Sequence, residues 1–149
     1  MYKTADEIQA DFPGVDAYVS VNKAVVTQSS AAIPIVPLYI SILFKVMKEQ
    51  KLHEDCIEQM YRLVHDRLCA SEVPVDDRRL IRVDDYEMRP EVQQAVEDIW
   101  KKINNDNLKD LTDLDGFWQG FYEIFGFRIE GVDYDADVDI QVSIPSLSE

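Results

Sequence analysis

The sequence predicts an α/β protein that is mostly helical and contains one or two short strands. Two runs rich in β-branched residues, Ala17–Val21 and Leu80–Val83, are the expected strands. Helical spacing of apolar residues fills most of the remaining chain. The 149 residues, 46% apolar and 30% charged, suit one ordinary globular domain or a piece of a larger one.

The chain is strongly acidic. Fifteen Lys and Arg residues stand against 29 Asp and Glu residues, which gives a net charge of −14. Because this charge repels phosphate backbones and anionic membranes, we expect no nucleic-acid partner and no membrane partner. The cysteines Cys56 and Cys69 are too few for a disulfide framework, and no signal peptide is present, so they indicate reduced thiols of a cytoplasmic protein.

The first elements are a helix, a strand and a polar loop. Met1–Asp11 has helical spacing and ends before Pro13-Gly14. The strand Ala17–Val21 follows, and Lys23–Ser30 is then expected to be a loop.

The most apolar stretch is Ile33–Gln50. Pro37 suits the first turn of a helix, where its missing N–H costs nothing. The uncharged helical part, Pro37–Phe44, falls far short of the ~20 residues of a membrane span, so a buried helix is expected. This helix is apolar on nearly all sides and therefore needs cover from other layers of a larger fold.

The second half of the chain predicts three further helices around the second strand. His53–Ala70 is expected to be amphipathic, with the stripe Ile57, Met60/Tyr61, Val64 and Leu68 on its buried face. The next helix begins at Pro90 and buries Val92, Val96, Ile99/Trp100 and Ile103. The last helix, Thr112–Phe125, is expected to be capped by Thr112, to end at Gly126, and to have an aromatic face that includes Phe117.

Neither a catalytic set nor a metal site emerges from the motifs. No glycine-rich phosphate loop and no nucleophile elbow occur. His53 and Cys56 could form half of a zinc site, but no second pair stands at ligand spacing. Asp133–Asp137 copies the start of a calcium loop without its glycine or its final glutamate.

One pattern does point to a ligand site. A strand leads through a loop containing Thr27 into the apolar helix, and open α/β folds bind ligands beyond the carboxyl ends of strands. Val36, Ile40 and Phe44 share one side of that helix. On spacing alone, this stripe is either the wall of an acyl channel or ordinary core packing.

Four separated blocks resemble one family in the same order. The blocks are VSVNKAVVTQSSAAIPIVPLYISILFKVMKEQKLHEDCIEQ (residues 19–59), PVDDRRLIRVDDYEM (74–88), NLKDLTDLDGF (107–117) and GFRIEGVDYDADV (126–138). They are similar to the trans-2-enoyl-CoA reductase family, which includes the FabV-type enoyl-acyl-carrier-protein reductases of fatty acid synthesis. The resemblance implies a Rossmann-type fold of the short-chain dehydrogenase kind and NADH-dependent reduction of the double bond of a 2-enoyl thioester.

The resemblance covers only the carboxyl-terminal part of that family. Its glycine-rich NADH loop and its catalytic tyrosine–lysine pair belong upstream, and Lys3–Ile8 resembles the helix that follows the catalytic lysine. Neither Tyr18 nor Lys23 has the spacing of that pair. We therefore expect this chain to be inactive alone. Residues 1–50 would be a late Rossmann strand, cofactor loop and substrate helix, 51–140 a helical cap, and 141–149 a tail.

The resemblance also implies site residues and partners. Val25, Val26 and Thr27 match the segment that touches the nicotinamide end of NADH. Val36, Ile40 and Phe44 match positions that line the acyl pocket, and Phe117 matches a substrate-binding aromatic near it. The expected partners are a CoA or acyl-carrier-protein thioester, and either a separate N-terminal reductase half or a second copy. The alternative is a stand-alone acidic interaction or scaffold protein that has lost the catalytic half.

Overall fold

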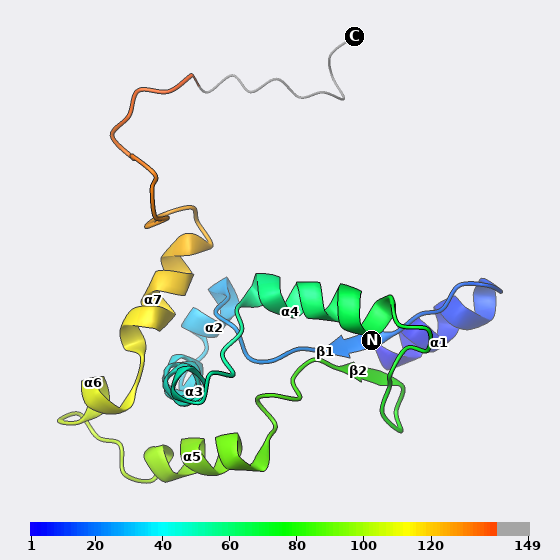
Figure 1. The fold of residues 1–149 in the computed structure, drawn as a ribbon, viewed down its shortest axis with the longest axis horizontal. Coiled ribbons are helices and arrows are strands. Elements are labelled where there is room, and N and C mark those ends of the chain that lie inside the picture. Colours follow the sequence, from blue (N-terminus) through cyan, green and yellow to red (C-terminus); the bar gives the residue numbers. More distant parts are fainter. Residues whose placement is uncertain (140–149) are drawn as a thin grey trace.

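Helices make up about half of the part of the chain that the computed structural model describes, which is residues 1–139 (Figure 1). The elements in order are α1 (Tyr2–Asp11), β1 (Val19–Val21), α2 (Gln28–Ala32), α3 (Val36–Glu49), α4 (Cys56–Arg62), the π-helix η1 (Leu63–Leu68), β2 (Leu80–Arg82), α5 (Pro90–Trp100), α6 (Leu108–Leu111) and α7 (Leu114–Glu123). The tail expected at 141–149 lies outside the described residues.

The two strands form a parallel pair. Val19 lies opposite Leu80, and Val21 lies opposite Arg82. Parallel strands need a long crossover, which α2 to η1 provide here. The expected strand 17–21 is thus confirmed in shortened form. Within residues 1–139, β2 covers one edge of β1, and the outer edge of each strand has no strand partner.

Helix α3 is the centre of the core. Its second half is buried from Ile40 to Met47, apart from a half-buried Lys45. Ile42, Leu43, Val46 and Met47 pack with Val92 and Val96 of α5, whereas Ile40 and Phe44 pack with Phe117 of α7. The chain therefore provides the cover that we expected to come from other layers of a larger fold.

The segment after α3 differs most from the prediction. The expected helix His53–Ala70 begins only at Cys56 and changes to a π-helix at Leu63. Its apolar stripe is exposed rather than buried, with Ile57 80% and Val64 52% accessible. The buried face belongs instead to Gln59 and Arg62.

Arg62 explains why the polar face turns inward. Its guanidinium binds both oxygens of Glu54, at 2.8 and 2.7 Å. It also donates to Asp85 at 2.6 Å and to the carbonyl of Val83 at 2.7 Å. Such a satisfied fork fixes α4 against the end of β2, because leaving the buried guanidinium of Arg62 without these partners would be costly.

The last helices follow the prediction in part. Val92 and Val96 are buried and Ile99 and Ile103 pack against them, but Trp100 is exposed. The short helix α6 was not expected. Thr112 does not cap α7, because its hydroxyl donates to the carbonyl of Leu108 at 2.7 Å.

Asp113 caps α7 in place of Thr112. After the helix, Gly126 has a φ of 77°, as expected at a helix end. Of the aromatic face predicted for α7, only Phe117 is fully buried in the described structure.

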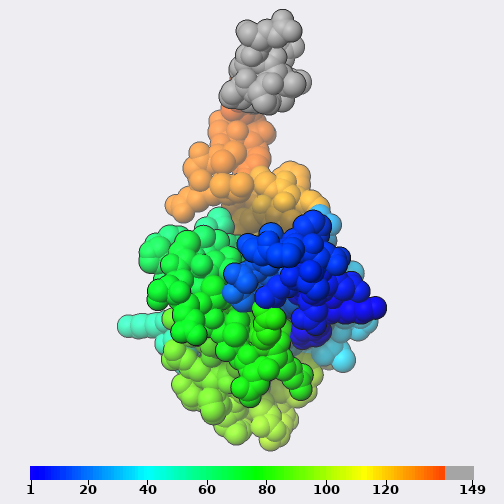
Figure 2. All heavy atoms as spheres, turned by 90° about the vertical axis from the view of Figure 1, so that its right-hand side faces the viewer, coloured from blue at the N-terminus to red at the C-terminus, as the bar shows by residue number. Residues whose placement is uncertain are grey.

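Two peripheral parts lie outside this core. Helix α1 buries no residue of its own and contacts the turn before β2 through Gln9, whose Oε1 accepts from Arg79 at 2.6 Å. Figure 2 shows α1 (dark blue) lying across one side of the molecule, while the segment after α7 (orange) projects away from the body. None of the helices in residues 1–139 is long and apolar enough to cross a membrane.

Asp113 joins α7 to α3. Its backbone N–H donates to the carbonyl of Ser41 at 2.8 Å, and its carboxylate accepts from Gly116 N–H at 3.0 Å and from Lys48 Nζ at 2.7 Å. Burial alone would raise the pKa of Asp113, but the bonds from Lys48 and Gly116 outweigh it and hold this pKa below its ordinary value.

Asp113→Ala should therefore destabilise the chain by ~1–2 kcal/mol in urea unfolding at neutral pH, because α7 loses its cap. A carboxylate whose pKa is lowered by folding stabilises the native state above its ordinary pKa and stops doing so as the pH falls through the lowered value. The difference between wild type and variant should thus shrink below pH ~4.

Asp115→Ala is the matched control, since Asp115 lies in the same helical turn and is exposed. It should change the free energy of unfolding by no more than ~0.5 kcal/mol. Equal effects of the two substitutions would show that Asp113 does not hold α7.

Candidate functional site

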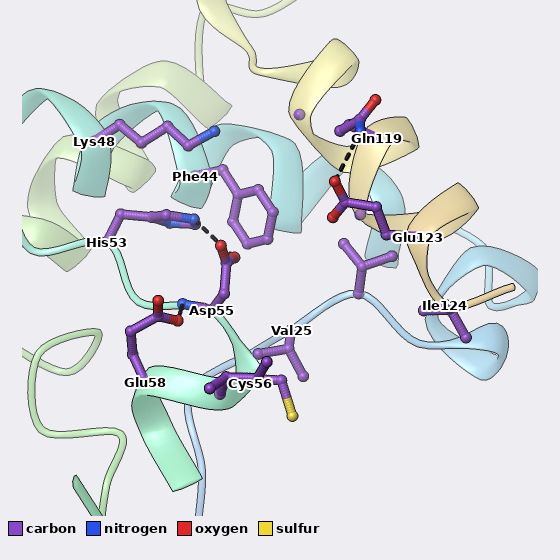
Figure 3. Close-up of a pocket in the computed structure, with 14 residues that line it drawn as sticks. Val25, Phe44, Lys48, His53, Asp55, Cys56, Glu58, Gln119, Glu123 and Ile124 are labelled. Carbon is purple, nitrogen blue, oxygen red and sulfur yellow. Dashed lines mark hydrogen bonds and ion pairs between the residues drawn. The ribbon is translucent and has the colours of Figure 1, made fainter. Parts of the chain in front are cut away.

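A cavity of about 640 Å³ lies where three parts of the chain meet. One wall is the loop between β1 and α2, with Val25 and Val26. The second is formed by Phe44 and Lys48 of α3 and the segment 53–58 that opens α4, and the third is α7 from Gly116 to Ile124. Figure 3 shows these side chains facing one another across the opening.

The loop wall contains two residues with unpaired backbone groups. Within the described residues, neither the N–H nor the carbonyl of Val25 or Val26 has a hydrogen-bond partner. The groups on either side are all engaged, since Lys23 N–H and Ala24 N–H donate to side chains and Thr27 N–H donates to Ser30 Oγ. Two consecutive residues can therefore donate and accept toward a ligand.

Thr27 has a local role. Its hydroxyl accepts from Ser30 N–H at 3.0 Å, and Ser30 Oγ accepts from Thr27 N–H at 2.7 Å, which together form a capping box at the start of α2. Its side-chain oxygen is thus in use as an acceptor. Thr27 does not line the cavity, whereas Val25 and Val26 do.

The four residues expected to form an acyl pocket lie together. Ile40, Phe44 and Phe117 form one buried cluster, and Val36 and Val26 pack against it. Only Phe44 of the four reaches the cavity surface. Ile40 and Phe117 lie behind it, so both sequence interpretations, pocket wall and core, describe the same cluster.

The cavity also has polar walls. His53 Nε2 lies 3.1 Å from Asp55 Oδ1, and the imidazole packs edge-on against the Phe44 ring with 4.6 Å between the centroids. The hydrogen bond with His53 lowers the pKa of Asp55. On the facing wall, Gln119 donates to Glu123 at 2.7 Å.

Sequence reasoning considered His53 only as half of a zinc site. In the structure, no group of three His, Cys, Asp or Glu residues in the described part of the chain could hold a metal ion. Cys56 lines the cavity as a free thiol. The pairing of His53 with Asp55 at i, i+2 was the signal in the sequence that could have drawn attention to this wall.

A lysine is buried behind Phe44. Lys23 is 2% exposed, and its Nζ donates to the carbonyl of Ala24 at 2.9 Å and lies 4.9 Å from the centre of the Phe44 ring. Burial lowers the pKa of Lys23, and the nearby carboxylate of Glu87 opposes that effect. The Phe44 ring therefore separates a buried amine from the cavity.

Gly120 allows α7 to approach the loop. A Cβ at this position would lie 3.5 Å from Val26 Cγ2, which is ordinary contact, so alanine would fit and larger side chains would press on the loop. The width of the cavity between Val26 and α7 is thus set by a glycine.

Two family models match the chain and together cover most of it. Residues 1–69 match the trans-2-enoyl-CoA reductase catalytic region, and residues 75–138 match the enoyl reductase FAD binding domain. The cavity is lined by residues of both matched regions.

Relatives with known names agree with these models. The chain is 58% identical over 134 residues to the NADH-dependent trans-2-enoyl-CoA reductase of Ruminiclostridium cellulolyticum, with 90% of this chain and 34% of the relative covered. It is 47% identical over 150 residues to an NADH-dependent enoyl-[acyl-carrier-protein] reductase of Coxiella burnetii, with 98% of this chain and 37% of the relative covered.

Solved structures give the same result. The trans-2-enoyl-CoA reductase of Treponema denticola in complex with NAD superposes with a TM-score of 0.85 at 45% identity, covering 92% of this chain and 35% of that one. The enzyme of Clostridium acetobutulicum in complex with NADH gives 0.86 at 42% identity, covering 93% and 36%. The chain thus spans about a third of the length of the proteins it matches.

The residues of 75–138 do not fit an FAD. A Rossmann-type dinucleotide site has a glycine-rich turn between a strand and a helix, but β2 leads into Val83, Asp84 and Asp85, with no glycine before α5. Asp84 already binds Arg82 through both oxygens, at 2.7 and 2.6 Å. These acidic groups would repel a pyrophosphate.

Both family models, the relatives and the solved structures agree with the sequence resemblance and with the α/β fold and its short parallel pair. The chain therefore belongs to the trans-2-enoyl-CoA reductase family.

Proposed function

We propose that this chain forms part of an NADH-dependent reductase of 2-enoyl thioesters, for which it supplies the nicotinamide-side loop and one wall of the acyl pocket. The observation that supports this most directly is the pair Val25 and Val26, two residues that line the cavity and whose backbone groups have no hydrogen-bond partner within the described residues. A carboxamide has one acceptor and one donor group, which matches the donors and acceptors of such a dipeptide.

In the proposed enzyme, NADH supplies a hydride to the substrate double bond. Val25 and Val26 would hold the carboxamide through their backbone N–H and carbonyl groups. The side chain of Phe44, backed by Ile40 and Phe117, excludes water from the same space. Val36 extends this apolar surface toward the start of α3. Thr27 contributes by fixing the turn into α2.

The rest of the enzyme would lie outside this chain. The exposed stripe of α4 and η1 (Ile57, Tyr61, Val64 and Leu68) and the open edge of β1 are surfaces of the kind that a larger Rossmann sheet and its helices cover. In the family that the chain resembles, the tyrosine–lysine pair comes from that part. A separate N-terminal half, a longer chain or a second copy would each provide such cover.

The alternative of a stand-alone acidic scaffold finds no support among the relatives, which are named as reductases. The substrate would be a CoA or acyl-carrier-protein thioester. Because the chain has a net charge of −14, the positive surface that such an anionic substrate requires would come from the remaining part. A cytoplasmic location belongs to the same proposal, since both cysteines are free thiols.

Grafting tests the proposed function. When these 149 residues replace the matching third of the Ruminiclostridium cellulolyticum enzyme, the hybrid should oxidise NADH in the presence of crotonyl-CoA, whereas the isolated chain should not exceed a blank without protein. With a reduced 3-acetylpyridine cofactor, which lacks the amide N–H, kcat/KM should fall by a factor of ~10 per lost hydrogen bond. A folded hybrid without activity, or an active isolated chain, would contradict the proposal.

Substitution of Phe44 tests whether the cluster of Ile40, Phe44 and Phe117 forms a wall of the acyl pocket or only part of the hydrophobic core. In the active hybrid, Phe44→Ala should raise kcat/KM for dodecenoyl-CoA relative to crotonyl-CoA, because it adds space to the cavity, and should cost ~3–5 kcal/mol of stability. Since the substitution also uncovers the buried amine of Lys23, Phe44→Leu, which keeps an apolar cover, should show a smaller shift without that effect.

Leu43→Ala is the control for Phe44. Leu43 is equally buried but faces α5 and not the cavity. It should lower the melting temperature and leave the chain-length preference unchanged. If both alanine variants only lower stability, the cluster of Ile40, Phe44 and Phe117 is core and no acyl wall.

The exposed stripe should make the isolated chain self-associate. Light scattering at low micromolar concentration should give a mass above that of one chain, because an uncovered apolar helix face favours association. Replacing both Val64 and Leu68 by Lys should restore the monomer. Val75→Lys, an exposed valine away from the stripe, should not. A monomeric wild-type chain would show that the stripe needs no partner.

A further inference from the structure

We propose that Glu87, with Gln59, is a positioning residue for the nicotinamide-side loop 23–27: both side chains hold the loop from the side away from the cavity and leave only Val25 and Val26 free to bind. The inference rests on the proposed function of that loop. Neither Glu87 nor Gln59 lines the cavity, so their effect on a ligand would be indirect.

Glu87 contacts the loop directly. Its Oε2 accepts from Ala24 N–H at 2.7 Å across 63 positions of sequence. Its Oε1 accepts from the Tyr39 hydroxyl of α3 at 2.6 Å, and its own carbonyl accepts from Gln93 Nε2 of α5 at 2.8 Å. Because the side chain is nearly buried, at 7% exposure, the carboxylate is fixed between α3 and α5 and fixes Ala24 in turn.

Gln59 makes the equivalent bond one residue earlier. Its Oε1 accepts from Lys23 N–H at 2.9 Å, and this residue of α4 is only 1% exposed. The capping box of Thr27 and Ser30 secures the other end of the loop. Three segments remote from one another thus satisfy every loop N–H except those of Val25 and Val26.

The charge of Glu87 has a second effect. The buried amine of Lys23 lies beside the same loop and forms no ion pair within the described residues, yet Glu87 acts on its pKa. A carboxylate here therefore offsets a buried positive charge as well as accepting a backbone bond. Tyr39 reports on the same group, because burial and its bond to Glu87 raise the pKa of Tyr39 to about 12.

The test compares Glu87→Ala, Glu87→Gln and Glu91→Gln in the active hybrid. Glu91 is an exposed acid at the start of α5 with no contact to the loop, so it is the matched control. Glu87→Ala should raise KM for NADH by a factor of ~10, the equivalent of one lost hydrogen bond. Glu87→Gln, which keeps an acceptor for Ala24, should raise it by a factor of ~3. KM for crotonyl-CoA should stay unchanged, and Glu91→Gln should match wild type.

A purely structural role would lower the melting temperature and the active fraction but leave KM for NADH unchanged in folded variants, which would overturn the inference. If Glu87→Ala does not fold, KM for NADH is compared between Glu87→Gln and the control Glu91→Gln. An unchanged KM in folded Glu87→Gln would overturn the inference.

Amide exchange in the isolated chain gives a readout that does not depend on activity. Ala24 N–H should be protected in wild type and exchange at least ~10-fold faster in Glu87→Ala, while Val25 and Val26 exchange rapidly in both. If the wild-type hybrid is inactive, the proposed function fails. Amide exchange then still tests whether Glu87 holds Ala24 N–H. An active hybrid in which Ala24 exchanges rapidly in wild type overturns this inference alone.

Discussion

The burial of α3 on two sides is the constraint on which the rest of the structure depends. A helix that is apolar around most of its circumference must be covered twice, and α5 and α7 provide the two covers. Asp113 fixes the second cover through Ser41 and Lys48. Because α7 is held there, the face of Phe44 that is not in the core meets the loop after β1, and the cavity forms between them.

Apolar periodicity predicted this core well and predicted the surface poorly. Ile40–Met47, Val92 and Val96 are buried as their spacing indicated. The stripe on α4 and η1 has the same spacing and is exposed, because periodicity shows that one face is apolar but not whether this chain supplies its partner. Arg62 and Gln59 take the buried face, since their hydrogen-bond partners lie far away in sequence, where no local pattern could indicate them.

The candidate site was partly predictable for the same reason. Spacing placed Ile40 and Phe44 on one side of a helix, the resemblance alone pointed to Phe117, and the three side chains pack together. The resemblance placed Thr27 in the nicotinamide segment, and the structure adds that its hydroxyl accepts from the N–H of Ser30, three residues on, and caps α2. Ser30 was visible in the sequence as a capping partner. Glu87 was not, because its bond to Ala24 spans 63 positions.

In the loop after β1, the groups available to a ligand belong to the backbone and not to side chains. A strand of three residues leaves its following N–H groups without ladder partners, and each must be satisfied or face water. Here Gln59, Glu87 and Ser30 satisfy three of them from different elements, and two remain. The unpaired dipeptide is held at both ends before any ligand arrives. The entropy cost of ordering it is therefore part of folding and does not reduce the free energy of ligand binding. In the proposed reductase, this chain would thus contribute preorganisation, while the groups that move protons lie in the remaining part.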